Sequence, residues 1–165
     1  MAWFRPALAV LLLAFLAGCN TFGKKDEDSE PMELQDIDAS VRVEKLWSNK
    51  VGRGPGRGGA GLRPTHADGQ LWVADRRGKI EVLDGRSGKV ARRLDLDLKL
   101  SAGPAVFDEY VAVGTINGQA VLIERDSGQV LWRAQLSSEI LSPPLLRDDV
   151  LVVRCIDGRI FGLNV

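Results

Sequence analysis

The sequence holds few side chains that could carry out acid–base or metal chemistry. His66 is the only histidine, so neither a histidine-based zinc cluster nor a Ser-His-Asp triad with a spare base can be assembled persuasively. We expect His66 in a turn beside Asp68 and Gly69. Asp95 and Asp97 alternate along a predicted strand and would face one side, which makes a weak cation site at most; solvated charges on a sheet edge are the simpler interpretation. We assign no catalytic residue, metal ligand or cofactor-binding residue.

A glycine-rich run resembles a phosphate-binding turn in its spacing only. Gly54, Gly56 and Gly59 satisfy the pattern G-x-G-x-x-G, but that site needs a following helix, and Gly61 and Pro64 interrupt the next stretch. The run could also be an arginine-glycine RNA-binding segment. The chain has 22 basic and 22 acidic residues and a formal charge of zero, so no attraction to nucleic acid is implied. We interpret the run as a flexible loop and expect no nucleic-acid partner.

The tryptophans and the second cysteine have structural interpretations. Trp47, Trp72 and Trp132 could stack a quinone in principle, but packing between strands explains them with fewer assumptions. Cys155 lies on a predicted strand, where a small buried apolar group is expected; a reactive or intermolecular thiol is the alternative. Two cysteines in 165 residues cannot supply a disulfide framework.

The amino terminus is a targeting segment. Arg5 precedes an apolar run over 7–16 that is too short to cross a hydrocarbon core of about 30 Å as a helix. The run leads into Leu16-Ala17-Gly18-Cys19, which resembles the bacterial lipoprotein box. The resemblance implies a signal peptide over 1–18 and lipid attachment at Cys19; an uncleaved signal anchor is the alternative. By the same resemblance, Asn20 after the cysteine favours the outer membrane, facing the periplasm.

Two further regions follow Cys19. Between 20 and 40 the chain has two lysines against seven acids, too polar to fold alone, so we expect 19–40 to be a flexible acidic tether. With 45% apolar and 6% aromatic residues overall, the remainder suits one globular domain.

That domain repeats every forty residues. Leu71–Asp75 overlays on Val111–Thr115 and on Leu151–Cys155, and Ser87-Gly88 overlays on Ser127-Gly128. Repeats of about 40 to 50 residues with short apolar runs between glycine turns are typical of β-propeller blades. A β-sandwich is the alternative, but a sandwich does not require a fixed register.

Each repeat predicts a four-stranded antiparallel sheet. In the second repeat the predicted strands are 104–107, 110–115, 119–125 and 130–136, separated by turns that include Asn117-Gly118. The fold class is therefore all-β, a partial propeller of about two and a half blades over 41–165. The predicted blades are about 62–96, 103–136 and 143–165, the third being cut short. An additional strand, Lys45–Val51, is expected before the first blade, because its Trp47 resembles Trp132 of the outer strand.

Several segments carry a family resemblance. Leu131-Trp132 after Asp126–Gln129, Pro143-Pro144-Leu145 and Asp157–Asn164 look like the PQQ-like repeat of quinoprotein propellers. With the lipoprotein box, the acidic tether and Leu46-Trp47-Ser48, the chain resembles the amino-terminal part of the eight-bladed BamB family of lipoproteins. Arg92 departs from the pattern, because it stands where the second blade has Trp132.

The resemblance implies a non-enzymatic scaffold of the β-barrel assembly (BAM) complex, without a cofactor. Its expected partners are the periplasmic domains of the barrel-forming subunit BamA, unfolded outer-membrane proteins and, through the lipid, the membrane. Strand or loop capture at blade edges is the expected mechanism. The partner-binding loops of the family lie mostly in later blades, so partner-binding residues stay unassigned. A periplasmic PQQ-type quinoprotein dehydrogenase and an inactive truncated fragment are the alternatives.

Overall fold

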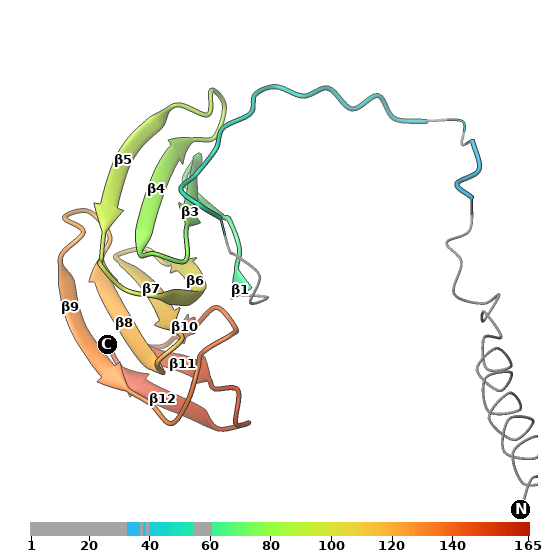
Figure 1. Cartoon of the computed structure of the whole chain (residues 1–165). Helices are drawn as coiled ribbons and strands as arrows, with labels where there is room; N and C mark the ends of the chain where they lie inside the picture. Colours follow the sequence, from blue (N-terminus) through green and yellow to red (C-terminus); the bar gives the residue numbers. More distant parts are fainter. Residues whose placement is uncertain (1–32, 37, 39, 55–60) are drawn as a thin grey trace, which may run out of the picture. The chain divides into compact units, whose positions relative to one another are not determined.

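The computed structural model describes residues 33–36, 38, 40–54 and 61–165. The chain divides into two units, Met1–Arg42 and Val43–Val165, and the strands belong to the second. The predicted signal peptide and Cys19 lie outside the described residues. The described residues form strands, turns and irregular segments, with no helix among them (Figure 1), and hence none in these ranges with the length and apolarity to cross a membrane.

Twelve strands are present in the described part of the chain. In chain order they are β1 (Gly61–Leu62), β2 (Thr65–Ala67), β3 (Gln70–Ala74), β4 (Lys79–Asp84), β5 (Val90–Asp95), β6 (Leu100–Val106), β7 (Tyr110–Thr115), β8 (Gln119–Glu124), β9 (Val130–Gln135), β10 (Leu145–Arg147), β11 (Val150–Arg154) and β12 (Ile160–Asn164). The strand β7 has the predicted bounds, while β6 begins at Leu100, earlier than the predicted start at Pro104.

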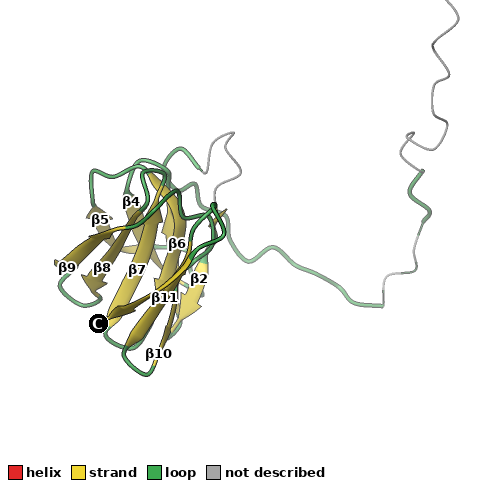
Figure 2. Cartoon of the chain, turned by 90° about the horizontal axis from the view of Figure 1, so that it is seen from below, coloured by secondary structure: helices red, strands yellow, loops and turns green. Residues whose placement is uncertain are grey.

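The strands form three sheets that lie side by side (Figures 1 and 2). We name them blade one (β2-β3-β4-β5), blade two (β6-β7-β8-β9) and blade three (β10-β11-β12), each antiparallel throughout. The short β1 adds a parallel strand to blade two beside β6. The predicted fold class, an all-β partial propeller, is confirmed.

The forty-residue offset of the sequence is also an offset of hydrogen bonds. One backbone N–H···O bond ties the same two turns together in every blade, and it moves by forty positions from one blade to the next. These bonds run from Gly85 to Gly69 (2.8 Å), from Arg125 to Glu109 (2.9 Å) and from Val165 to Asp149 (3.0 Å). A second bond, from one blade to the linker before it, recurs as Ile116 to Lys99 (3.1 Å) and Ile156 to Glu139 (2.8 Å). Residues forty apart are therefore structural equivalents.

The hydrophobic core consists of the two junctions between neighbouring blades. Side chains of a strand alternate between its two faces, so Val111 and Val113 of β7 pack toward blade one while Ala112 packs toward blade three. Blade two is consequently buried on both faces. At the second junction the hydroxyl of Ser101 donates to the carbonyl of Ile140 at 2.7 Å, in a fully buried contact.

The predicted strand Lys45–Val51 is wrong. The segment has no backbone ladder, and side chains make its contacts instead: the indole N–H of Trp47 donates to the carbonyl of Gly85 at 3.1 Å, and the amide of Asn49 donates to the carbonyl of Gly88 at 2.9 Å. Both acceptors belong to the turn between β4 and β5. Trp47 therefore covers a turn of blade one and does not occupy the position of Trp132 in an outer strand.

Candidate functional site

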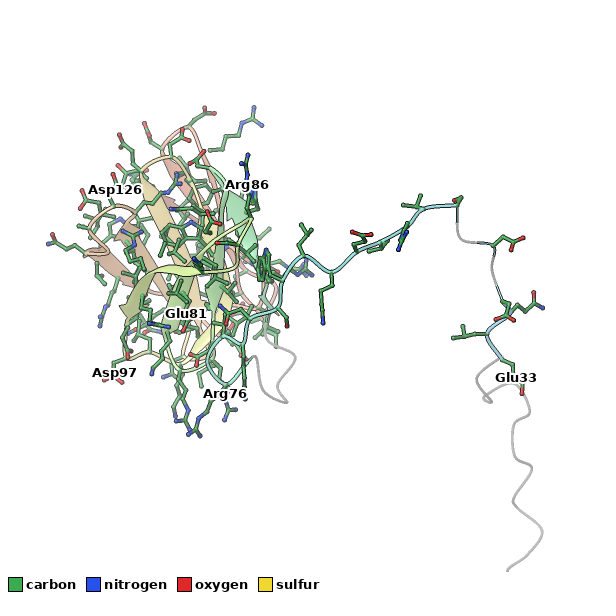
Figure 3. The ribbon with its side chains drawn as sticks, turned by 90° about the horizontal axis from the view of Figure 1, so that it is seen from above. Glu33, Arg76, Glu81, Arg86, Asp97 and Asp126 are labelled. Carbon is green, nitrogen blue, oxygen red and sulfur yellow. The ribbon has the colours of Figure 1, made fainter. Side chains whose placement is uncertain are left out.

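The blades present their turns at two opposite ends. Figure 3 shows Arg86 and Asp126 at one end of the sheets and Arg76 and Asp97 at the other. At the end that carries Asp126, hollows open where neighbouring blades meet. The first, of about 400 Å³, lies between blades one and two. Its lining residues are Asp68, Gln70, Trp72, Val82, Ala91, Arg92, Arg125 and Asp126.

Arg125 joins blades one and two at this hollow. One terminal nitrogen donates to the carboxylate of Asp68 at 2.5 Å, and the other donates to the carbonyls of Phe107 and Asp108, each at 3.3 Å. The guanidinium carbon also lies 5.9 Å from the centroid of the Trp72 ring. The side chain of Arg125 is only 13% exposed. Acceptors from both blades and the aromatic face of Trp72 hold it in place.

Arg92 supplies a second guanidinium over the same ring. Its guanidinium carbon is 5.1 Å from the ring centroid of Trp72, and its terminal nitrogens donate to the carbonyls of Arg125 and Asp126. Blade two has Trp132 at the equivalent position. The first junction therefore has Arg92, which bonds to two carbonyls of the next blade. The second junction has the aromatic Trp132 at the equivalent position. Trp72 is fully buried beneath both guanidinium groups.

Asp75 organises the opposite end of blade one. Its carboxylate is almost fully buried and accepts backbone N–H bonds from Arg77 (2.8 Å), Lys79 (3.1 Å) and Arg53 (3.2 Å). Burial raises the pKa of Asp75, but these hydrogen bonds and the charge of Lys79 outweigh it and hold the pKa below its ordinary value. The equivalent residue, Thr115, accepts one such bond, from Gln119 at 2.8 Å. Asp75 thus fixes the β3–β4 turn and also the segment around Arg53, which precedes blade one.

Comparison with known proteins defines the family. The family model described as "Outer membrane protein assembly factor BamB" matches residues 76–165, more than half of the chain. The chain belongs to the BamB family. A BamB of Xanthomonas campestris is 37% identical over 139 residues, which cover 73% of this chain and 34% of that protein. A BamB of Taylorella asinigenitalis is 34% identical over 109 residues, covering 66% of this chain and 28% of the relative.

A solved structure agrees with the fold. The crystal structure of BamB from Moraxella catarrhalis superposes with a TM-score of 0.56 at 22% identity, covering 64% of this chain and 32% of that one. At this level of identity the likeness shows the fold. This BamB-family chain spans about a third of the length of the curated relatives that it matches.

The residues singled out from the sequence do not meet in one place. In this BamB-family chain, Trp72 packs in the first core cluster and Trp132 packs against the second, while Trp47 lies on a turn. Packing between strands, as predicted, accounts for Trp72 and Trp132. For Trp47 the prediction is wrong, because this side chain covers a turn. Cys155 is a free thiol, 2% exposed, in the second cluster, which confirms the prediction of a small buried group.

Two placements differ from the sequence analysis. His66 lies in β2, one position before the end of the strand, and not in the turn; its side chain is exposed because the strand's alternation points it outward. Asp95 ends β5, and Asp97 follows it with a left-handed φ of 51°. The two aspartates therefore do not alternate along a strand. Within the ranges that the structure describes, no three His, Cys, Asp or Glu side chains gather in a way that could hold a metal ion.

Of the glycine pattern, Gly54 is described and has a φ of 68°; Gly56 and Gly59 lie outside the described residues. Sequence reasoning missed Arg125, Asp68 and Asp75. A signal for Asp68 was present, because acidic residues recur at forty-residue spacing as Asp68, Asp108 and Asp148.

Proposed function

We propose that this chain is a non-enzymatic scaffold in outer-membrane protein assembly, held at the periplasmic face of the outer membrane by lipid on Cys19. The observation that carries the proposal is the continuous match of the BamB family model across 76–165. Strands β4 to β12 all lie within that match. Relatives that match 73% and 66% of the chain are named outer membrane protein assembly factors.

The architecture suits a binding role. Blade two is buried on both faces, so it cannot bend without breaking the two junction cores. The turns at the blade ends are exposed, which leaves them available to a partner while the sheets hold them in fixed positions. In the proposed organisation, residues 1–18 direct export, 19–40 form the tether from the lipid, and 41–165 form the binding domain.

Co-purification tests this function. The full chain, tagged at its carboxyl terminus and expressed in a Gram-negative host, is expected to retain the barrel-forming subunit BamA when outer membranes are solubilised, because we infer that the blades bind its periplasmic domains. A tagged segment of residues 1–40 is the control, since it has the lipid site and the tether but no blades. Loss of BamA from the full-chain sample, or equal recovery with the control, would contradict the proposed function.

The anchor has its own test. A Cys19→Ala variant is expected to move from the membrane fraction to the soluble periplasmic fraction, because each buried methylene of an acyl chain contributes about 0.8 kcal/mol to membrane binding and the variant has no thiol to acylate. Cys155→Ala is the matched control and should stay with the membrane. Membrane retention of Cys19→Ala after a high-salt wash would count against acyl anchoring.

A further inference from the structure

A second hollow, of about 570 Å³, lies between blades two and three. It opens between the β6–β7 and β10–β11 turns, and its lining residues are Val106, Phe107, Asp108, Glu109, Tyr110, Leu146, Arg147, Asp148 and Asp149. The carboxylate-bearing residues at its rim are exposed, whereas Phe107, Tyr110 and Leu146 are half-buried. We call this hollow the second-junction groove. It combines an apolar floor with an acidic rim.

The first junction shows what the equivalent acceptors bind. There, Arg125 takes the carboxylate of Asp68 and the carbonyls of Phe107 and Asp108. Forty positions later these acceptors become the carboxylate of Asp108 and the carbonyls of Arg147 and Asp148. All three of these residues line the second-junction groove. The same set of acceptors is thus repeated at the second junction.

The guanidinium itself is not repeated. The residue equivalent to Arg125 is Val165, whose backbone N–H makes the equivalent bond, to Asp149, and whose side chain packs against the second core cluster. The residue equivalent to Trp72 is Ala112. At the second junction, the side chains of Ala112 and Val165 therefore do not fill the space that Trp72 and Arg125 fill at the first. The repeat therefore places arginine acceptors at the second junction without supplying an arginine at the position of Arg125.

The charge of the groove favours a cation. Four carboxylates line it, from Asp108, Glu109, Asp148 and Asp149, against the one guanidinium of Arg147. Arg147 is 84% exposed and lies 3.6 Å from the carboxylate of its neighbour Asp148. An exposed pair of this length is worth little, so Arg147 leaves most of the negative charge uncompensated.

We propose that the second-junction groove binds an arginine side chain carried by an extended segment of a partner protein. The guanidinium lies between the carboxylate of Asp108 and the carbonyls of Arg147 and Asp148, as Arg125 does at the first junction. Its planar fork suits several acceptors at once. The side-chain stem and a neighbouring apolar residue of the segment lie on Phe107 and Tyr110, which replace the aromatic contact that Trp72 gives to Arg125.

A peptide titration tests the groove. The probe is the pentapeptide Gly-Leu-Arg-Leu-Gly, blocked at both ends, added to the ¹⁵N-labelled full chain in detergent micelles. We expect saturable shifts of the backbone amide signals of 107–110 and 146–149, and no such shifts with the citrulline peptide, which has the same shape and no charge. Asp108→Asn should raise the Kd about tenfold, the change expected when a charged hydrogen-bond acceptor is neutralised. Asp148→Asn should raise it less, because the proposed contact is with the backbone carbonyl, which this substitution keeps.

Two further variants sharpen the result. Val165→Arg places an arginine where the first junction has Arg125, and is expected to abolish peptide binding by filling the groove from within. Asp97→Asn, at the opposite end of blade one, is the matched control and should leave the Kd unchanged. Equal shifts with the citrulline peptide, shifts confined to other turns, or an unchanged Kd in Asp108→Asn would overturn the proposal. The titration contains no assembly-complex component, so its outcome is independent of the co-purification result.

Discussion

Replacing Trp72 by alanine is expected to lower the free energy of unfolding by about 3 to 5 kcal/mol, the range for removing a large aromatic side chain from a core. Trp72 is fully buried and packs with Ile80, Val82 and Val111 in the first junction. Its ring also lies under the two guanidinium groups of Arg92 and Arg125. The substitution removes packing and the aromatic face for both arginines in one step. Urea unfolding of the full chain in detergent, followed by circular dichroism, measures the loss.

Three comparisons assign the effect to the junction. Trp72→Phe should cost clearly less, because it keeps an apolar ring and because the indole N–H of Trp72 has no hydrogen-bond partner to lose. Trp47→Ala should also cost less, since Trp47 is only half-buried and lies on a turn. A double-mutant cycle of Trp72→Ala with Arg92→Ala should give a coupling energy of about 0.5 to 2 kcal/mol. If Trp72→Ala destabilised no more than Trp47→Ala, the ring would not hold blades one and two together.

The first junction also explains how blade one manages without the outer-strand tryptophan. Trp132 of β9 packs toward blade three, and its equivalent in β5 is Arg92. Arg92 reaches further than an indole and makes hydrogen bonds to the next blade, to the carbonyls of Arg125 and Asp126. Those carbonyls lie in the β8–β9 turn, so the turn geometry of blade two and the side chain of blade one are fixed together. A departure from the repeat has thus become a specific contact between blades.

Strand positions were predictable because they depend on local patterns that occur again forty residues later. The alternation of apolar residues and the glycine turns located β7 and placed β8 and β9 within one residue at their carboxyl ends. The overlay also located β11, because Leu151–Cys155 continues the register of Val111–Thr115. Each of these strands needs only its own sequence and its immediate neighbours in the sheet.

Contacts outside the repeat were not predictable in the same way. Trp47 resembles an outer-strand tryptophan in its local sequence, but the segment around it bonds through side chains to a turn of blade one. Which surface such a segment covers depends on the tertiary structure and not on its own periodicity. The acidic rim of the second-junction groove was more nearly predictable, because the acidic pairs Asp108-Glu109 and Asp148-Asp149 are forty residues apart in the sequence. The sequence shows that the residue equivalent to Arg125 is Val165. It does not show that Arg125 neutralises Asp68, and so it does not show which contact is absent at the second junction.

Two equivalent glycines separate backbone strain from steric contact. Gly118 and Gly158 occupy the same turn position in blades two and three, with φ of 77° and 86°. Each donates its N–H to the residue three positions earlier, at 3.1 Å in both cases. An added Cβ at Gly118 would lie 2.7 Å from the carbonyl oxygen of Ser138, whereas at Gly158 nothing lies within 4 Å. Alanine is therefore strained by its φ at both positions and clashes with backbone only at Gly118.

Gly158→Ala is expected to lower the free energy of unfolding by about 1 to 2 kcal/mol, the cost of a left-handed conformation for a residue with a Cβ. Gly118→Ala should lose a further 1 to 3 kcal/mol or so, because Ser138 must move and it belongs to the linker between blades two and three. The linker cannot yield freely, since the hydroxyl of Ser138 bonds to the N–H of Asp157 at 3.2 Å. Urea unfolding of the two variants measures the difference. Equal losses would show that the linker moves aside at no cost and that the second junction is less tightly packed than its buried core indicates.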